Sequence, residues 1–145
     1  MTHQDKGHYR KKHPPEKSLP PSLAGEVRKS ARENRISCAR AFRVSARTGA
    51  PPDQVGAAID FEEISLEKCQ LGLFGYGPGK NILHPLEEVS PKLKQAIETS
   101  LVEGRLPCAA AWEIAKRLRL SRVFVARACE TLKIRISKCQ LGAFR

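Results

Sequence analysis

Hydrophobic positions in the C-terminal part of the chain follow a helical spacing in three successive segments. This spacing predicts helices over residues 91–104, 107–118 and 121–133. Alternating apolar residues over 134–136 then predict a short strand. The residues expected to face inward are Leu93, Ala96, Ile97, Leu101, Ala111, Trp112, Ala115, Leu118, Val125, Ala128, Cys129 and Leu132.

The same order of elements occurs earlier, because the chain is a duplication. A shift of 70 residues aligns residues 35–74 with 105–144 and gives 14 identities over 40 positions, whereas unrelated segments share about two or three. The seven residues Lys68–Phe74 return as Lys138–Phe144 with a single difference. The predicted fold class is therefore mainly α, with two tandem three-helix units that are each followed by a short β-strand.

The duplication and the composition predict four parts of the chain. Each repeat is small for a self-sufficient core, so the two copies are expected to support each other. The parts are a disordered basic arm at 1–19, a first unit at 20–75, a Gly- and Pro-rich linker at 76–89 and a second, basic unit at 90–145.

In each unit the second and third helices resemble a helix-turn-helix. That family has small residues inside the first helix of the pair, often a glycine at the turn, and aliphatic residues where the two helices cross. The matching residues are Ser45, Gly49, Val55 and Ala58 in the first unit, and Ala115, Leu118, Leu120, Val125 and Ala128 in the second. In the second unit, Arg119 takes the place of the turn glycine. The following strand is similar to the start of a wing in winged-helix proteins, so the resemblance implies tandem DNA-binding domains.

Positive charge is unevenly distributed along the chain. The formal net charge is +11, and residues 105–145 hold ten Lys and Arg against two Glu. Residues 50–75 hold one Lys against five acidic residues. A surface with such a basic half favours the binding of a polyanion. We therefore expect nucleic acid, in particular double-stranded DNA, as the partner.

The resemblance implies that the outer side of the third helix of the second unit enters the major groove. The residues expected to meet base edges and nearby phosphates are Ser121, Arg122, Ala126 and Arg127, and those expected to flank them on phosphates are Lys116, Arg117, Arg119, Arg135 and Lys138. A basic, solvated helix face with no specific partner is the alternative.

The first unit has no cation at the equivalent positions of its third helix, where Asp53 and Asp60 would repel phosphate. We therefore expect this unit to act as a support. Its acidic edge would face either the second unit or a second subunit. In the second case the protein would form a homodimer. Arg40, Arg43 and Arg47 form a basic stripe on the preceding helix that could still contact a DNA backbone.

Four of the five cysteines follow the repeat, Cys38 with Cys108 and Cys69 with Cys139. One hypothesis is that these thiols bind zinc or an iron-sulfur cluster, or form a redox switch. The alternative is that they are small buried residues of two equivalent cores, with no cofactor at all. A third hypothesis treats the Gln-Leu-Gly-x-Phe segments as a docking surface of a protein-interaction module.

Other function classes find little support in the sequence. Gly75–Lys80 lacks the spacing and the following Ser or Thr of a phosphate-binding loop, and no nucleophilic triad stands out, so we expect no enzyme. No apolar run is long enough to cross a bilayer, and residues 1–19 have no apolar stretch typical of a signal peptide. The resulting expectation is a cytoplasmic DNA-binding protein that is a candidate transcriptional regulator.

Overall fold

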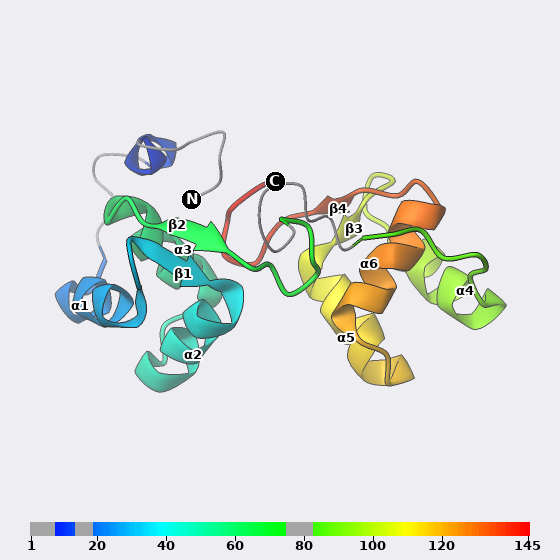
Figure 1. Ribbon diagram of the computed structural model, residues 1–145, viewed down its shortest axis with the longest axis horizontal. Coiled ribbons are helices and arrows are strands. Elements are labelled where there is room, and N and C mark those ends of the chain that lie inside the picture. Colours follow the sequence, from blue (N-terminus) through cyan, green and yellow to red (C-terminus); the bar gives the residue numbers. More distant parts are fainter. Residues whose placement is uncertain (1–7, 14–18, 75–82) are drawn as a thin grey trace. The chain divides into compact units, whose positions relative to one another are not determined.

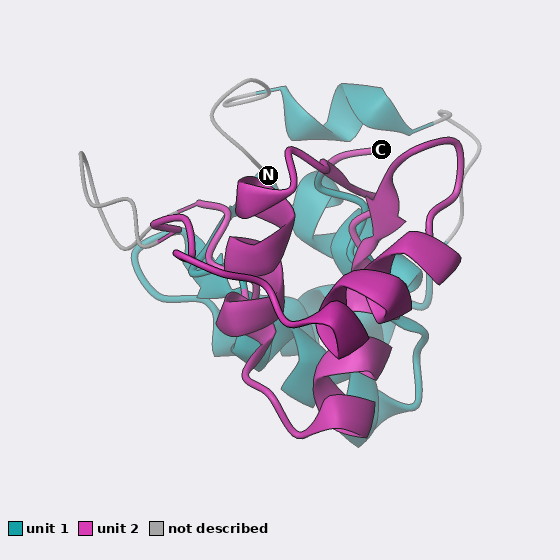
Figure 2. Cartoon of the chain, turned by 90° about the vertical axis from the view of Figure 1, so that its right-hand side faces the viewer, with its two compact units in different colours: residues 1–69, 140–143 teal, residues 70–139, 144–145 magenta. Residues whose placement is uncertain are grey.

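The computed structural model describes residues 8–13, 19–74 and 83–145, and it confirms a mainly helical fold (Figure 1). The chain forms two compact units, which Figure 2 colours separately. Among the described residues, each unit contains three α-helices and a two-stranded parallel sheet. No helix in the described residues has the length and apolar character needed to span a membrane.

Unit 1 begins its described part with a short 3-10 helix. Its elements are η2 (Tyr9–Lys12), α1 (Pro21–Ser30), β1 (Arg35–Ser37), α2 (Cys38–Thr48), α3 (Pro52–Phe61) and β2 (Ser65–Glu67). Ser37 caps α2 by accepting a hydrogen bond from the amide of Arg40, and Gly49 ends that helix with a left-handed φ of 78°. The core of the unit is built around the fully buried residues Val27, Val44 and Ile59.

Unit 2 repeats this plan with α4 (Pro91–Thr99), β3 (Leu106–Pro107), α5 (Cys108–Leu118), α6 (Arg122–Thr131) and β4 (Ile136–Ser137). Ser90 and Ser121 cap α4 and α6 with their hydroxyl groups. Arg119 adopts the left-handed conformation at the end of α5, with φ 57°. An arginine therefore takes the backbone conformation that Gly49 has in the first unit.

The strand after the third helix is not the start of a wing. In each unit it pairs in parallel with a short strand just before the second helix, β1 with β2 and β3 with β4. The sequence did not predict this earlier strand, because it has only two or three residues and no alternation to detect. The first helix of unit 2 also ends at Thr99, five residues short of the expected Gly104.

The unit boundaries differ from the expected ones at the Gln-Leu-Gly-x-Phe segments. Residues 140–143 belong to unit 1, and residues 70–74 belong to unit 2. Leu71 and Leu141 are both buried, so these segments contribute to the two cores, and their burial gives no support to a docking surface. Phe144 stays in unit 2. Because the segments are nearly identical, the sequence could not show that residues 70–74 and 140–143 each pack in the unit of the other repeat.

Part of the N-terminal arm is held in the fold, whereas residues 1–7 and 14–18 of the arm and residues 76–82 of the expected linker lie outside the described residues. Residues 8–13 pack against α3 of unit 1, and Tyr9 is only 2% exposed. Buried aromatic side chains contribute strongly to packing, which explains why this part of a basic arm is held in place.

Candidate nucleic-acid interface

The side of α6 that the helix-turn-helix resemblance assigns to base contact is partly inside the protein. Ala126 is 1% exposed, so the expected contact of this residue with a base is wrong. Leu73 and Phe74 line the same hollow of unit 2 as Ala126. The physical reason is therefore that the segment after Gln70 packs on this side of α6, where a duplex groove would have to lie.

Arg122 is bound within unit 2. Its guanidinium carbon lies 3.6 Å from the centre of the Trp112 ring, and Nη1 donates a hydrogen bond of 3.3 Å to Oε1 of Gln70. Stacking on tryptophan is the strongest form of cation–π contact. The guanidinium expected to meet base edges and phosphates is thus engaged by residues of its own unit.

Arg127 is similarly engaged, because its Nε donates a hydrogen bond of 2.8 Å to the carbonyl oxygen of His84. Both Arg122 and Arg127 are partly buried. A specific contact with bases would require these side chains to give up their present partners. The geometry therefore favours phosphate contact over base contact in this unit.

An exposed basic feature lies at the C-terminal end of α5 and in the turn that follows it. We call Lys116, Arg117 and Arg119 the turn cluster; all three side chains are exposed. Within residues 83–145, as far as the structure describes them, none of the three forms an ion pair. Ser121 is exposed in the same turn, and its hydroxyl accepts a hydrogen bond from the amide of Phe124. Three exposed cations, with no ion pair among the described residues, thus lie at the end of α5 and in the turn before α6.

The other expected phosphate contacts lie at the opposite end of α6. Arg135 and Lys138 are exposed and flank β4, whereas the turn cluster precedes α6. The 10 residues of α6 correspond to a helix of about 15 Å. The residues expected to flank the site on phosphates therefore form two separate groups, one before α6 and one after it.

Arginines of unit 1 are largely tied to their own unit. Arg47 forms an ion pair of 2.8 Å with Glu26, and Arg40 donates to the carbonyl oxygen of Ser30. Arg43 is exposed. Of the basic stripe expected on α2, Arg43 is thus the residue most available to a phosphate.

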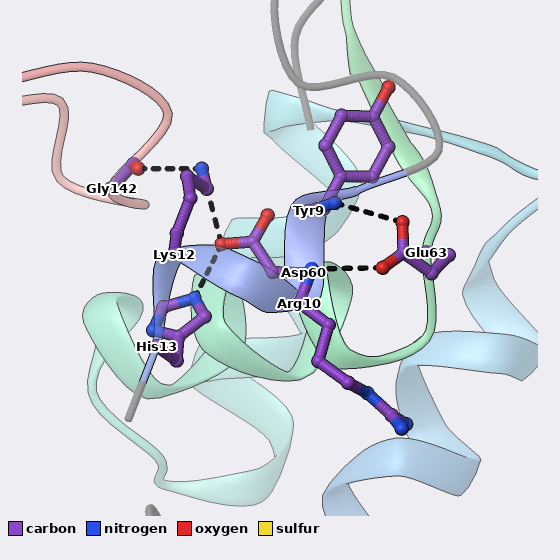
Figure 3. Close-up of polar contacts among 7 residues, drawn as sticks. All are labelled: Tyr9, Arg10, Lys12, His13, Asp60, Glu63 and Gly142. Atoms are coloured by element: carbon purple, nitrogen blue, oxygen red, sulfur yellow. Dashed lines mark hydrogen bonds and ion pairs between the residues drawn. The ribbon is translucent and has the colours of Figure 1, made fainter. Parts of the chain in front are cut away.

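The acidic edge of unit 1 binds the N-terminal arm (Figure 3). The carboxylate of the fully buried Asp60 lies 2.7 Å from Nε2 of His13 and 3.3 Å from Nζ of Lys12. Glu63 accepts hydrogen bonds of 2.9 Å from the amides of Tyr9 and Arg10. Sequence reasoning missed this site; the signal available was an acidic helix end together with a basic segment that contains a tyrosine.

The phenol of Tyr9 completes the arm site. Its hydroxyl is 2.9 Å from Oγ of Ser65 on β2, and Nζ of Lys12 also donates to the carbonyl oxygen of Gly142. The ring of His13 stacks on Phe61 at 5.3 Å between centroids. Aromatic burial, ion pairs and backbone hydrogen bonds together hold residues 9–13 on unit 1.

We expect docking of the arm to weaken in acid because of Glu63. Burial acts to raise the pKa of Glu63, but hydrogen bonds from the amides of Arg10 and Tyr9 outweigh it and lower the pKa below the ordinary value of 4.5. A lowered pKa stabilises the docked arm above the ordinary value, and this contribution is lost as the pH falls through the lowered value. Hydrogen exchange of residues 8–13 between neutral pH and about pH 3 measures the effect.

Glu63→Gln is expected to reduce this protection at neutral pH, and the difference from the wild type should vanish in acid. Glu62→Gln is the matched control, because Glu62 pairs with Arg28 of α1 and not with the arm. Equally reduced protection in the two variants would contradict the role of Glu63.

The cysteines behave mainly as core residues. Four are buried and Cys139 is partly buried. Burial, helped by the nearby carboxylate of Glu130, raises the pKa of Cys129 to about 12, so this thiol is not ionised at neutral pH. No cluster of three or more His, Cys, Asp and Glu suited to a metal ion occurs in the described residues. Binding of zinc or an iron-sulfur cluster stays a prediction that these contacts do not support.

Comparison of the chain with protein families, with curated proteins and with solved structures found no match. Evidence for a function therefore comes from the side chains of the two units alone. The turn cluster is available to an anionic partner, because its cations are exposed, whereas Arg122 and Arg127 are engaged in the fold.

Proposed function

We propose that the protein binds nucleic acid, most plausibly double-stranded DNA, through phosphate contacts at the turn cluster of unit 2. The observation that carries the proposal is the exposure of Lys116, Arg117 and Arg119 at the end of α5 and in the turn after it, without ion pairs among the described residues. Phosphate contacts supply most of the affinity of non-specific DNA binding. The helix-turn-helix resemblance supports the same region, since the first helix of the pair crosses the DNA backbone in that family, and Lys116 and Arg117 lie in α5.

The binding mode that we propose depends weakly on base sequence. Arg122 and Arg127 have partners within unit 2, and Ala126 is buried, so α6 presents few groups that could distinguish one base from another. A role in transcription and a cytoplasmic location are parts of this proposal. The protein would then be a regulator that binds DNA mainly through the phosphates of the backbone.

The proposal is tested by replacing the turn cluster with alanine. We expect the triple variant Lys116→Ala, Arg117→Ala, Arg119→Ala to bind a fluorescent 20-base-pair duplex at least about tenfold more weakly at low salt, because a phosphate without a protein cation keeps its counterions. The slope of log K against log salt should fall by about one for each phosphate that the variant no longer neutralises. Fluorescence anisotropy over a range of salt concentrations measures both quantities.

A matched control removes the same charge elsewhere on unit 2. The triple variant Lys92→Ala, Lys94→Ala, Arg105→Ala changes three exposed cations outside the turn. We expect it to keep most of the affinity and of the salt slope. Equal weakening by both variants would show that net charge alone drives binding, and would contradict a site at the turn.

A further inference from the structure

The arm site of unit 1 has an equivalent in unit 2, where the surface is hollow. Seven of the ten residues that line a groove in unit 2 lie between Ala126 and Ile136. The shift of 70 residues maps this segment onto residues 56–66, which include Asp60, Glu63 and Ser65. Those three residues hold the N-terminal arm in unit 1.

The backbone confirms that the two surfaces are equivalent. Ile36 pairs with Leu66 in unit 1, and Leu106 pairs with Ile136 at the same positions of the repeat. Glu63 and Lys133, which correspond to each other, both have left-handed φ angles, 53° and 56°. The same elements with the same register therefore form both surfaces.

The groove of unit 2 has a volume of about 560 Å³, which lies within the range of small-ligand and peptide-anchor pockets. Its walls are largely apolar and include two aromatic rings. The apolar lining residues include Leu73, Phe74, Ile134, Ile136 and Phe144, and the charged lining residues are Glu130, Lys133 and Arg135. Such a groove suits an aromatic side chain with charged groups around it.

In unit 1 the occupant of the equivalent surface is a peptide of this chain. The amides of Tyr9 and Arg10 donate hydrogen bonds to Glu63 there (Figure 3). The Tyr9 side chain is buried, and its hydroxyl contacts Ser65. An acidic surface thus binds a segment in which an aromatic anchor is followed by basic residues. Unit 1 shows what kind of occupant this surface of the fold accepts.

The charge of the surface is reversed in unit 2. Glu63 corresponds to Lys133, and the neutral Ser65 corresponds to Arg135, while Asp60 is retained as Glu130. Lys133 and Arg135 are both exposed. A basic arm would be repelled by these two cations, whereas an acidic segment would be attracted.

We propose that the groove of unit 2 binds an acidic peptide segment with an aromatic anchor, supplied by a partner protein. The aromatic ring takes the place that Tyr9 has in unit 1, and acidic side chains on either side meet Lys133 and Arg135. The site is separate from the turn cluster, because the two lie at opposite ends of α6. Peptide binding and DNA binding can therefore succeed or fail independently.

The test uses the full chain and a fluorescein-labelled hexapeptide, Glu-Glu-Tyr-Glu-Glu-Glu. We expect saturable binding by fluorescence anisotropy, and binding at least about tenfold weaker for the same peptide with alanine in place of tyrosine. The double variant Lys133→Glu, Arg135→Ser gives unit 2 the residues of unit 1. It should bind the acidic peptide about tenfold more weakly and gain affinity for a labelled Tyr-Arg-Lys-Lys-His peptide.

Two controls keep the result specific. The turn-cluster triple variant should bind the acidic peptide as the wild type does, and circular dichroism of the double variant should show unchanged folding. Glutamate at position 133 is compatible with the backbone, since Glu63 has the same φ region in unit 1.

Three outcomes would overturn the proposal. One is equal binding of the tyrosine and alanine peptides, which would indicate attraction by net charge alone. Another is retained binding in the double variant. The third is binding only after Tyr76→Ala, which would indicate that the chain's own segment, outside the described residues, competes for the groove.

Discussion

Replacing Leu141 with alanine is expected to destabilise unit 1, although Leu141 belongs to the second repeat. Leu141 is 1% exposed and is part of the segment 140–143 that packs in unit 1. Removal of a buried leucine side chain costs about 2–4 kcal/mol of the free energy of unfolding, through reduced apolar burial and the cavity that remains. Hydrogen exchange should show faster exchange in α2 and α3, with α5 and α6 little changed.

Leu71→Ala is the reciprocal experiment. Leu71 is fully buried, is equivalent to Leu141 in the repeat, and belongs to unit 2. We expect a similar loss of stability, now in α5 and α6. Trp112 is the single tryptophan of the chain and lies in α5, so its fluorescence during urea unfolding follows unit 2. If each variant destabilised the unit formed by its own repeat, the exchange of segments would be contradicted.

Gly56→Ala is expected to lower the free energy of unfolding of unit 1 by about 2 kcal/mol. Alanine normally favours a helix over glycine by up to about 1 kcal/mol. At Gly56 in α3, however, a Cβ atom would overlap the backbone carbonyl of Leu141. Backbone cannot rotate away as a flexible side chain can, so the segment 140–143 must shift. Urea unfolding followed by circular dichroism measures the loss.

Gly25→Ala is the matched control for this variant. Gly25 is also in a helix, α1, and a Cβ atom there would meet nothing within 4 Å. We expect this variant to be more stable than the wild type by about 0.5–1 kcal/mol, through the helix preference alone. A stabilising effect of Gly56→Ala of the same size would show that the segment does not pack closely on α3.

Much of the fold could be predicted from local features of the sequence. The predicted starts at Pro91 and near Cys108 agree with α4 and α5, since a serine or proline before an apolar helical pattern marks a helix start. The internal repeat predicted two units of three helices. These features depend on residues close in sequence, which is why they can be recognised without coordinates.

Side-chain partners in the candidate site could not be predicted in the same way. Arg122 and Lys116 are both basic residues on predicted helices, yet one stacks on Trp112 and the other is exposed. The difference depends on Gln70 and Trp112, of which Gln70 lies far from Arg122 in sequence. Spacing predicted where cations occur, and tertiary packing determined which of them stay available to phosphate.

The sequence by itself determined the duplication, the helices and the basic character of the second repeat, because these follow from identity, periodicity and residue type. Only the tertiary structure decided which unit each Gln-Leu-Gly-x-Phe segment joins, since Leu71 and Leu141 are the same residue in nearly the same context. It also decided that Tyr9 is an anchor and not part of a disordered arm. The physical reason is that burial and pairing depend on residues brought together from distant parts of the chain, which no local pattern records.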